Sequence, residues 1–372
     1  MPSLFLHLIV IFFSCVFAAI GVQQNQRKGY KTMKINAGYI LSFLLVAIFL
    51  ASRTYLGRDW DNYYRIFSSV YQQEFEFGES RELGFLLLVR LLNSLGLEFH
   101  SFISITAILT TVLFYMAFRK QYALLPIAIF FFFVGQEYSM VINTIRQGIA
   151  VFCFLNALNY IEDEKRPFLK YMVFILIGAL FHYSILVFIP FYWVAKIKFN
   201  PYVLYGVCAA LFAFCFFFLM DIYGDVLLAI PKYSGYIGDD HVFADNSTFG
   251  LGAILLLTLR IVPLFFYQPV VKRYPQSRKY FILYALGISI YYSFYKFLLI
   301  TRFTFYLQFC ELFVFSFLIL YWWHSKNVFT KVFTIGYLGL TLFNFIYLFK
   351  DFLEDQLVRN NFSIMFMDFT FR

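Results

Sequence analysis

Apolar runs long enough to cross a membrane follow one another along most of this chain, and they limit its possible folds more than any other feature. The first run extends from Leu4 to Val22. A helix that crosses the hydrocarbon core of a bilayer needs roughly 20 mainly apolar residues. Hydrophobic residues make up 62% of the 372 residues, which is more than a soluble domain could hide in its core. The sequence therefore predicts an all-α, polytopic integral membrane protein.

Basic residues are concentrated in the short connections between these runs, and Arg119-Lys120 and Lys196 to Lys198 are two examples. Cytoplasmic loops of membrane proteins carry an excess of lysine and arginine. The net charge of +9 is thus explained by orientation in the membrane. Its dispersal over many loops argues against a nucleic-acid partner. Two long connections, 52–81 and 221–250, are left for the external face.

The number of crossings between these loops requires one apolar segment to stay out of the bilayer core. Two apolar runs separate the first external connection from the cytoplasmic Arg119, where only an odd number can cross. The shorter run, Leu83 to Leu97 within the segment Glu82 to Leu97, would be about 22 Å long as a helix, and the hydrocarbon core is about 30 Å thick. We expect it to lie on the outer leaflet as an interfacial helix. The alternative, a short third span with Arg119 outside, stays open.

This choice predicts a single transmembrane domain over residues 1–372, with about twelve transmembrane helices and both termini outside. Its large external parts are residues 52–99, which include the interfacial helix, and residues 221–249. The expected spans are 4–22, 35–51, 100–118, 122–135, 146–161, 168–182, 184–197, 201–220, 250–271, 280–294, 302–323 and 328–349.

The five cysteines lie inside apolar runs, without the spacing of metal ligands and outside any long loop that a disulfide would stabilise. We therefore expect neither a metal nor a cofactor. The five aspartates between residues 221 and 250 leave cation binding open.

Unusual polar residues gather on the external side of this topology. Charges at this depth cost several kcal/mol unless they are paired, so a functional role is the first interpretation. The segments are RTYLGRDWDNYY from Arg53, RELGF from Arg81, NTIRQ from Asn143, FHYS from Phe181 and TRFTFY from Thr301.

Each of these residues also has a purely structural explanation. Arg146 could extend to the headgroups, or pair with Glu137 or Asp59. His182 could cap or pack a tight turn, and Asp59 and Asp61 could shape the turn at Gly57. The shared location of these residues on one side favours a functional site.

The collection suits transfer of a group from a lipid diphosphate. Arginines bind phosphate oxygens in a bidentate way and keep their charge at any working pH. A carboxylate in a polar loop can take a proton from a sugar hydroxyl. A diphosphate leaving group needs charge neutralisation, so one base and the arginines suffice, whereas a glycosidase normally needs two carboxylates.

The same segments resemble the EpsG family of bacterial exopolysaccharide membrane proteins, which is related to the Wzy-type O-antigen and capsule polymerases. The resemblance implies a glycosyltransferase of the polymerase type in the bacterial inner membrane, with its active site facing the periplasm. It would transfer a glycan from undecaprenyl diphosphate onto a lipid-linked repeat unit. The architecture is also similar to that of glycosyltransferase C enzymes. The motifs are Arg53-x-Tyr55-x-Gly57-x-Asp59-x-x-x-Tyr63, Glu82-Leu83-Gly84-Phe85, Asn143-x-x-Arg146-Gln147, His182-Tyr183-Ser184 and Arg302-x-x-x-Tyr306.

Each candidate residue has an expected role in this transfer. Arg146 and Arg302 are expected to bind the diphosphate, and Asp59 or Glu82 to be the base. His182 is expected to orient a phosphate or an acceptor hydroxyl. Arg53 is expected to hold its loop by pairing with Asp59 or Asp61. The candidate catalytic residues are Asp59, Glu82, Arg146 and His182, and the candidate substrate-binding residues are Arg53, Arg58, Asp61, Tyr63, Asn143, Gln147, Arg302 and Tyr306.

Two rival functions use the same chemistry or the same lipid. One is an O-antigen ligase or a single-sugar transferase with a polyprenyl donor. The other is a transporter (flippase) of lipid-linked oligosaccharides, although transporters often show internal repeats and charges at the midplane that this sequence lacks. The expected partners are the undecaprenyl-diphosphate-linked oligosaccharide, the lipid bilayer, a chain-length regulator and a flippase.

Overall fold

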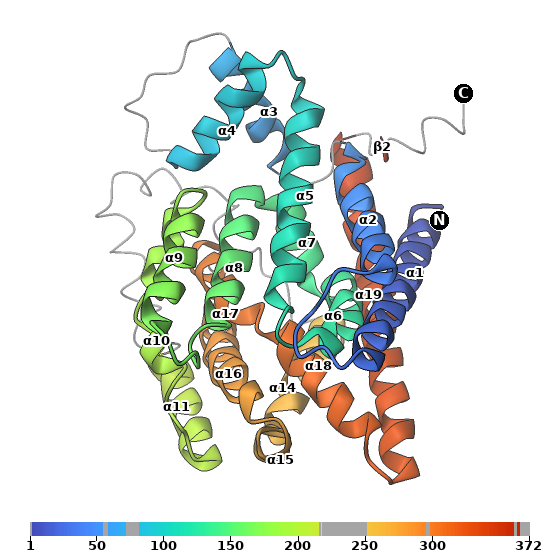
Figure 1. Ribbon diagram of the computed structural model, residues 1–372, viewed down its shortest axis with the longest axis vertical. Helices are drawn as coiled ribbons and strands as arrows, with labels where there is room; N and C mark the ends of the chain where they lie inside the picture. The colour runs from blue at the N-terminus through green and yellow to red at the C-terminus, as the bar shows by residue number, and fades with distance from the viewer. Residues whose placement is uncertain are drawn as a thin grey trace. The chain divides into compact units, whose positions relative to one another are not determined.

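The structure, a computed structural model, describes residues 2–54, 59–71, 82–215, 217, 251–294, 298–360 and 363–364. The described chain is almost entirely helical (Figure 1). Its contacts divide it into two compact units, residues 1–189 with 339–372 and residues 190–338.

The first unit is built from helices joined by short connections. The two-residue strand β1 (Arg53–Thr54) pairs antiparallel with β2 (Ser363–Ile364). The helices are α1 (Pro2–Arg27), α2 (Ala37–Ala51), α3 (Trp60–Tyr71), α4 (Leu83–Ser94), α5 (Phe99–Ala117), η1 (Tyr122–Leu124), α6 (Leu125–Val134), α7 (Gln136–Asn143), α8 (Ile145–Leu158), α9 (Pro167–Ala179) and η2 (Tyr183–Phe188).

Helix α8 forms the centre of this unit. Every one of its residues is buried except Arg146. A helix that is apolar on all sides must be surrounded by other elements. Asn156 anchors α8 to α5, because its Nδ2 donates to the carbonyl oxygen of Leu113 at 2.8 Å. The fold therefore fixes α8 and leaves one charged residue of its first turn accessible.

Helix α4 has one buried face and one exposed face. Phe85 and Val89 are buried, whereas Leu83, Leu87 and Leu91 are about half exposed, with exposed fractions of 48%, 54% and 55%. This leucine row repeats every four residues, which is the spacing of one helix face. Helices α3 and α4 lie together beside one end of α5 (Figure 1). This leucine face is open to the surroundings of the protein, and the interfacial position of residues 82–97 stays a prediction of the sequence.

Four described helices are long and apolar enough to cross a membrane, or six if each of two bent helix pairs forms one span. The chain is thus a multi-pass membrane protein. The four helices are Leu4–Arg27, Phe99–Ala117, Arg302–Trp323 and Val328–Tyr347, and the bent pairs are Tyr122–Val134 with Glu137–Asn143 and Ile254–Phe265 with Tyr267–Arg273. These lengths do not establish the twelve crossings expected from the sequence.

Several expected spans differ from the helices that form. The segment 184–197 is not one helix: η2 is followed by the four-residue α10 (Phe191–Val194). Pro190 separates the two, since proline has no N–H to continue a helical ladder. At the end of the chain, α19 (Val328–Asn360) continues beyond the expected residue 349.

The second unit has a buried ion pair that the sequence reasoning did not single out. Arg260 Nε lies 3.1 Å from Glu311 Oε2, and these side chains are 2% and 3% exposed. The Tyr284 hydroxyl also donates to the Arg260 carbonyl oxygen at 2.8 Å. Such a pair links its two helices, and removing one partner strongly destabilises the fold because it leaves the other charge buried and unpaired. The helices here are α11 (Pro201–Phe214), α14 (Leu251–Phe265), α15 (Tyr267–Arg273), η4 (Pro275–Ser277), α16 (Arg278–Ser293), α17 (Leu298–Gln308) and α18 (Glu311–Trp323).

Candidate active site

Glu82 joins two other candidate residues in one cluster within the first unit. Its Oε2 lies 2.6 Å from Nη1 of Arg146, and its Oε1 lies 2.8 Å from Nδ1 of His182. The Glu82 side chain is 7% exposed, whereas those of Arg146 and His182 are 28% and 29% exposed. The carboxylate is therefore enclosed, and the two groups it holds remain accessible.

The fold places Glu82 beside His182 through a close contact between the start of α4 and the chain after α9. The backbone N–H groups of Gly84 and Phe85 donate to the carbonyl oxygen of Leu180, at 2.8 and 3.2 Å. A Cβ atom at Gly84 would lie 2.7 Å from the Cβ of Leu180. Glycine is thus required for this contact, which sets Glu82 next to the residue two positions after Leu180.

Arg146 is held by aromatic rings as well as by Glu82. Its guanidinium carbon lies 5.2 Å from the ring centre of Phe85 and 6.0 Å from that of Tyr63. Such contacts stabilise a cation modestly. Its Nε is buried, and no described residue is a hydrogen-bond partner of this atom. Arg146 also stands in the first turn of α8, and its own backbone N–H lies 3.5 Å from the Tyr63 hydroxyl. The N-terminus of a helix attracts anions.

The carboxylate of Glu82 stays ionised over the working range of an enzyme. Burial by itself raises the pKa of Glu82, but the hydrogen bond from His182 and the charge of Arg146 outweigh it and lower the pKa to about 2. A carboxylate bonded to one ring nitrogen of a histidine fixes the orientation of the ring. With Nδ1 donating to Glu82, the Nε2 lone pair of His182 is available, and Nε2 has no partner among the described residues.

Asp59, the other candidate base, forms no ion pair with Arg146 or His182 in the described structure. Its carbonyl oxygen accepts the N–H of Tyr63 at 3.0 Å, which begins α3. Its carboxylate lies 3.4 Å from Nδ2 of Asn62 on the same helix. The side chain of Asp61 is exposed on α3. Arg146 pairs with Glu82, and not with Asp59 or Glu137 as the structural explanation from the sequence would have it.

The expected pairing of Arg53 with Asp59 or Asp61 does not form among the described residues. The Arg53 side chain is buried, at 4% exposure, and its Nε has no hydrogen-bond partner. The two side chains point in different directions, because that of Arg53 extends between α5, α7 and α8, whereas that of Asp61 is exposed to solvent. This expectation is therefore corrected.

The remaining candidates are spread over both units. Asn143 ends α7, with Nδ2 3.5 Å from Ser139 Oγ, and Gln147 is buried in α8. Arg302 and Tyr306 belong to α17 of the second unit, where the side chain of Arg302 is exposed and that of Tyr306 is fully buried. Arg58 and the whole segment 221–249 lie outside the described residues.

No group of three or more His, Cys, Asp or Glu residues that could hold a metal ion occurs in the part of the chain that the structure describes. The cluster offers one enclosed carboxylate, one guanidinium and one imidazole. Chemically, these groups can bind an anion and accept a proton.

The chain is thus a multi-pass membrane protein with a compact polar site of Glu82, Arg146 and His182. These residues lie at the ends of α4, α8 and α9. The model of the EpsG family matches residues 36–362, and the chain belongs to this family of polysaccharide polymerase-like membrane proteins. No curated protein and no solved structure matches the chain. Membership of the family indicates a function of the polysaccharide-polymerase type.

Proposed function

We propose that the protein is a polymerase that transfers a growing glycan from undecaprenyl diphosphate to a lipid-linked repeat unit, at the external face of the bacterial inner membrane. The observation that carries this proposal is the double contact of Glu82 with Arg146 and His182. This double contact brings together an arginine, which can bind phosphate, and a histidine, which can accept a proton. The three residues come from segments that are far apart in the chain. Family membership supports the polymerase class.

Arg146 binds the diphosphate of the donor lipid in this proposal. Its accessible guanidinium can form bidentate bonds with phosphate oxygens. As the bond between the sugar and the diphosphate breaks, negative charge grows on the leaving oxygen. Arg146 and the positive end of α8 neutralise this charge, which is where such groups contribute most. Arg302 remains a proposed second contact.

His182 acts as the base, with Glu82 as its positioning residue. The acceptor hydroxyl oxygen attacks the anomeric carbon of the donor sugar, and the bond from that carbon to the diphosphate oxygen breaks. The hydroxyl proton passes to Nε2 of His182. Glu82 holds Nδ1 and so directs Nε2 toward the acceptor. Asp59 is the rival base, and aromatic residues near it in sequence, such as Tyr64, would then hold the acceptor sugar.

The proposed membrane arrangement follows the sequence analysis. About twelve crossings, with α4 on the outer leaflet, would put the site at the external surface, as in glycosyltransferase C enzymes. The exposed leucines of α4 support the interfacial position. A flippase and a chain-length regulator are the proposed protein partners.

Incubation of the purified protein with a lipid-linked repeat unit in detergent tests the function. A polymerase produces a ladder of products on a gel. A single product band points to a ligase or a single-sugar transferase, and chemically unchanged lipid points to a transporter.

A further inference from the structure

Arg53 is a buried cation without a counter-ion among the described residues. It is 4% exposed, and its Nε has no hydrogen-bond partner. Burial lowers the pKa of Arg53 to about 10, against a smaller opposing effect of Tyr138 and Tyr63, so the side chain is still charged at neutral pH. A charge in such a place costs several kcal/mol unless something pairs with it.

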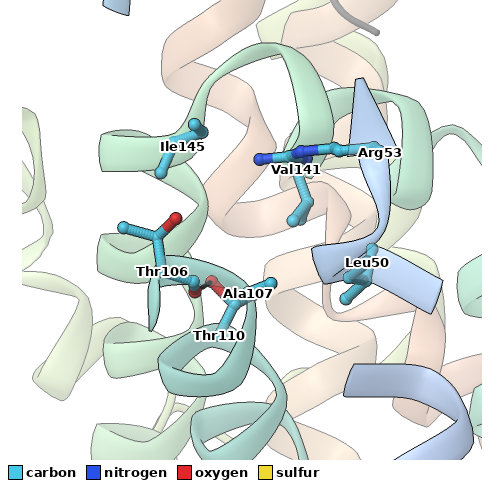
Figure 2. Close-up of a pocket in the computed structure, with 7 residues that line it drawn as sticks. All are labelled: Leu50, Arg53, Thr106, Ala107, Thr110, Val141 and Ile145. Carbon is cyan, nitrogen blue, oxygen red and sulfur yellow. Dashed lines mark hydrogen bonds between the residues drawn. The ribbon is translucent and has the colours of Figure 1, made fainter. Parts of the chain in front are cut away.

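The guanidinium of Arg53 faces a small cavity of about 10 Å³. This is room for about one oxygen atom or water molecule. Figure 2 shows the side chain extending from β1 toward the side of the cavity formed by Ile145. We call this cavity, with the residues around it, the Arg53 pocket; its lining is Leu50, Arg53, Thr106, Ala107, Thr110, Val141 and Ile145.

The Arg53 pocket adjoins the candidate active site. Ile145, which lines the pocket, is the first residue of α8 and immediately precedes Arg146. The charge of Arg53 is influenced by Tyr63, whose ring also lies 6.0 Å from the guanidinium carbon of Arg146. The first N–H groups of a helix have no acceptor within it. The N-cap residue Thr144 caps none of them through its side chain, and the Arg146 N–H lies 3.5 Å from the Tyr63 hydroxyl. The buried guanidinium of Arg53 and the first residue of α8 therefore line the same pocket.

We propose that the Arg53 pocket receives one oxygen of a phosphate group, with Arg53 and the first turn of α8 as its donors. The volume fits a single oxygen, so the phosphorus atom and its other oxygens would stay outside the cavity. The identification of this phosphate as part of the donor lipid rests on the proposed function. Binding of free diphosphate to the same groups does not.

The test is a titration of the purified full-length protein in detergent with two probes, inorganic diphosphate and farnesyl diphosphate. The rise in unfolding temperature with probe concentration gives the affinity for each, because a ligand stabilises the state that it binds. Arg53→Gln should weaken binding of both probes by about 10- to 100-fold, which is the range for a lost hydrogen bond to a charged group. Arg53→Lys should lose less, since it keeps the charge but not the planar fork.

Arg119→Gln, which removes an exposed arginine at the end of α5, is the matched control and should bind both probes as the wild type does. A structural role of Arg53 would lower the unfolding temperature without probe but leave the probe affinities unchanged, and this result overturns the proposal. If Arg53→Gln does not fold, Arg53→Lys decides, and wild-type affinity in that variant counts against the pocket.

The two probes separate this proposal from the proposed function. Binding of inorganic diphosphate that depends on Arg53, without binding of farnesyl diphosphate, supports the pocket and contradicts a lipid donor. Binding of both probes in an Arg53-dependent way supports both proposals. A wild-type protein that binds neither probe contradicts the pocket.

Discussion

The Nδ1 atom of His182 lies 2.8 Å from Oε1 of Glu82, although 100 residues separate them in the chain. The same carboxylate holds Arg146 through its other oxygen. Glu82 thus determines the position of both groups that a diphosphate-linked sugar would meet. A diphosphate that binds Arg146 competes with one side of this arrangement and leaves the other, the pair of Glu82 and His182, in place.

The base should be revealed by comparing His182→Gln with Asp59→Asn. A positioned base contributes about 10²–10⁴-fold to a rate, so His182→Gln should reduce turnover by that factor with donor binding retained. Asp59→Asn should remain within about tenfold of the wild type, because asparagine caps a helix and fits a turn as well as aspartate does. Initial rates of repeat-unit addition measure both. A reversed order of the two variants would move the base to Asp59.

Arg146→Lys tests whether the shape of the side chain matters or only its charge. Lysine keeps the charge but lacks the planar fork that binds two phosphate oxygens. We expect about 10²–10³-fold less polymer, the loss typical of removing one group that stabilises a leaving anion. Polymer yield is compared at equal protein abundance, with Arg119→Lys as the control. Polymer at the wild-type rate in Arg146→Lys would contradict a bidentate site.

Gly84→Ala tests the contact that places Glu82. The new Cβ would lie 2.7 Å from Leu180 Cβ and 2.9 Å from the Leu180 carbonyl oxygen, so the start of α4 must move away from His182. Polymer formation should fall sharply and the unfolding temperature should drop. Gly206→Ala is the matched control, since a Cβ there meets nothing within 4 Å. It should stabilise α11 by about 0.5–1 kcal/mol and leave activity unchanged. Equal behaviour of the two variants would exclude this positioning role.

The pKa of Glu82 gives a stability prediction with a definite sign. Folding lowers this pKa from its ordinary value of 4.5 to about 2. The stabilisation is therefore complete above about pH 4.5 and is lost as the pH falls from there toward 2. At pH 7, Glu82→Gln should be less stable than the wild type by about 1–3 kcal/mol in the free energy of unfolding. It should therefore unfold at a lower temperature. The difference should shrink between pH 4.5 and 2. A difference that stays constant over this range would show that the carboxylate charge is not the cause.

The orientation in the membrane is open to cysteine labelling in intact spheroplasts. A single cysteine that replaces Asp61 should react with an impermeant maleimide. One that replaces Gln276, in the basic connection between α15 and α16, should react only after the membrane is opened. Reaction at Gln276 in intact spheroplasts would invert the proposed topology.

Much of the helical fold could be read from apolar run length, because a helix must satisfy its own backbone in a bilayer. The start of α8 at Ile145 is within one residue of the expected span that begins at 146. The break between η2 and α10 was harder to predict, since Pro190 lies in an otherwise uninterrupted apolar run. The packing of neighbouring elements decides such breaks.

The candidate site was predictable as a set of residue types but not as a set of contacts. Charges in unusual places pointed to Glu82, Arg146 and His182. Nothing in their spacing showed that Glu82 bridges the other two, since that depends on Gly84 docking against Leu180. The burial of Arg53 was likewise hidden, because a nearby pair of aspartates offered a more obvious partner.

The most direct test of the proposed site counts lipid diphosphate released for each repeat unit joined, in wild-type protein and in His182→Gln. The proposed mechanism requires one undecaprenyl diphosphate to be released per glycosidic bond formed by the wild type. In His182→Gln, both release and bond formation should fall together by about 10²–10⁴-fold, with farnesyl diphosphate still bound at near wild-type affinity. Release and polymer formation at wild-type rates in His182→Gln, or polymer formed without release of undecaprenyl diphosphate, would contradict it.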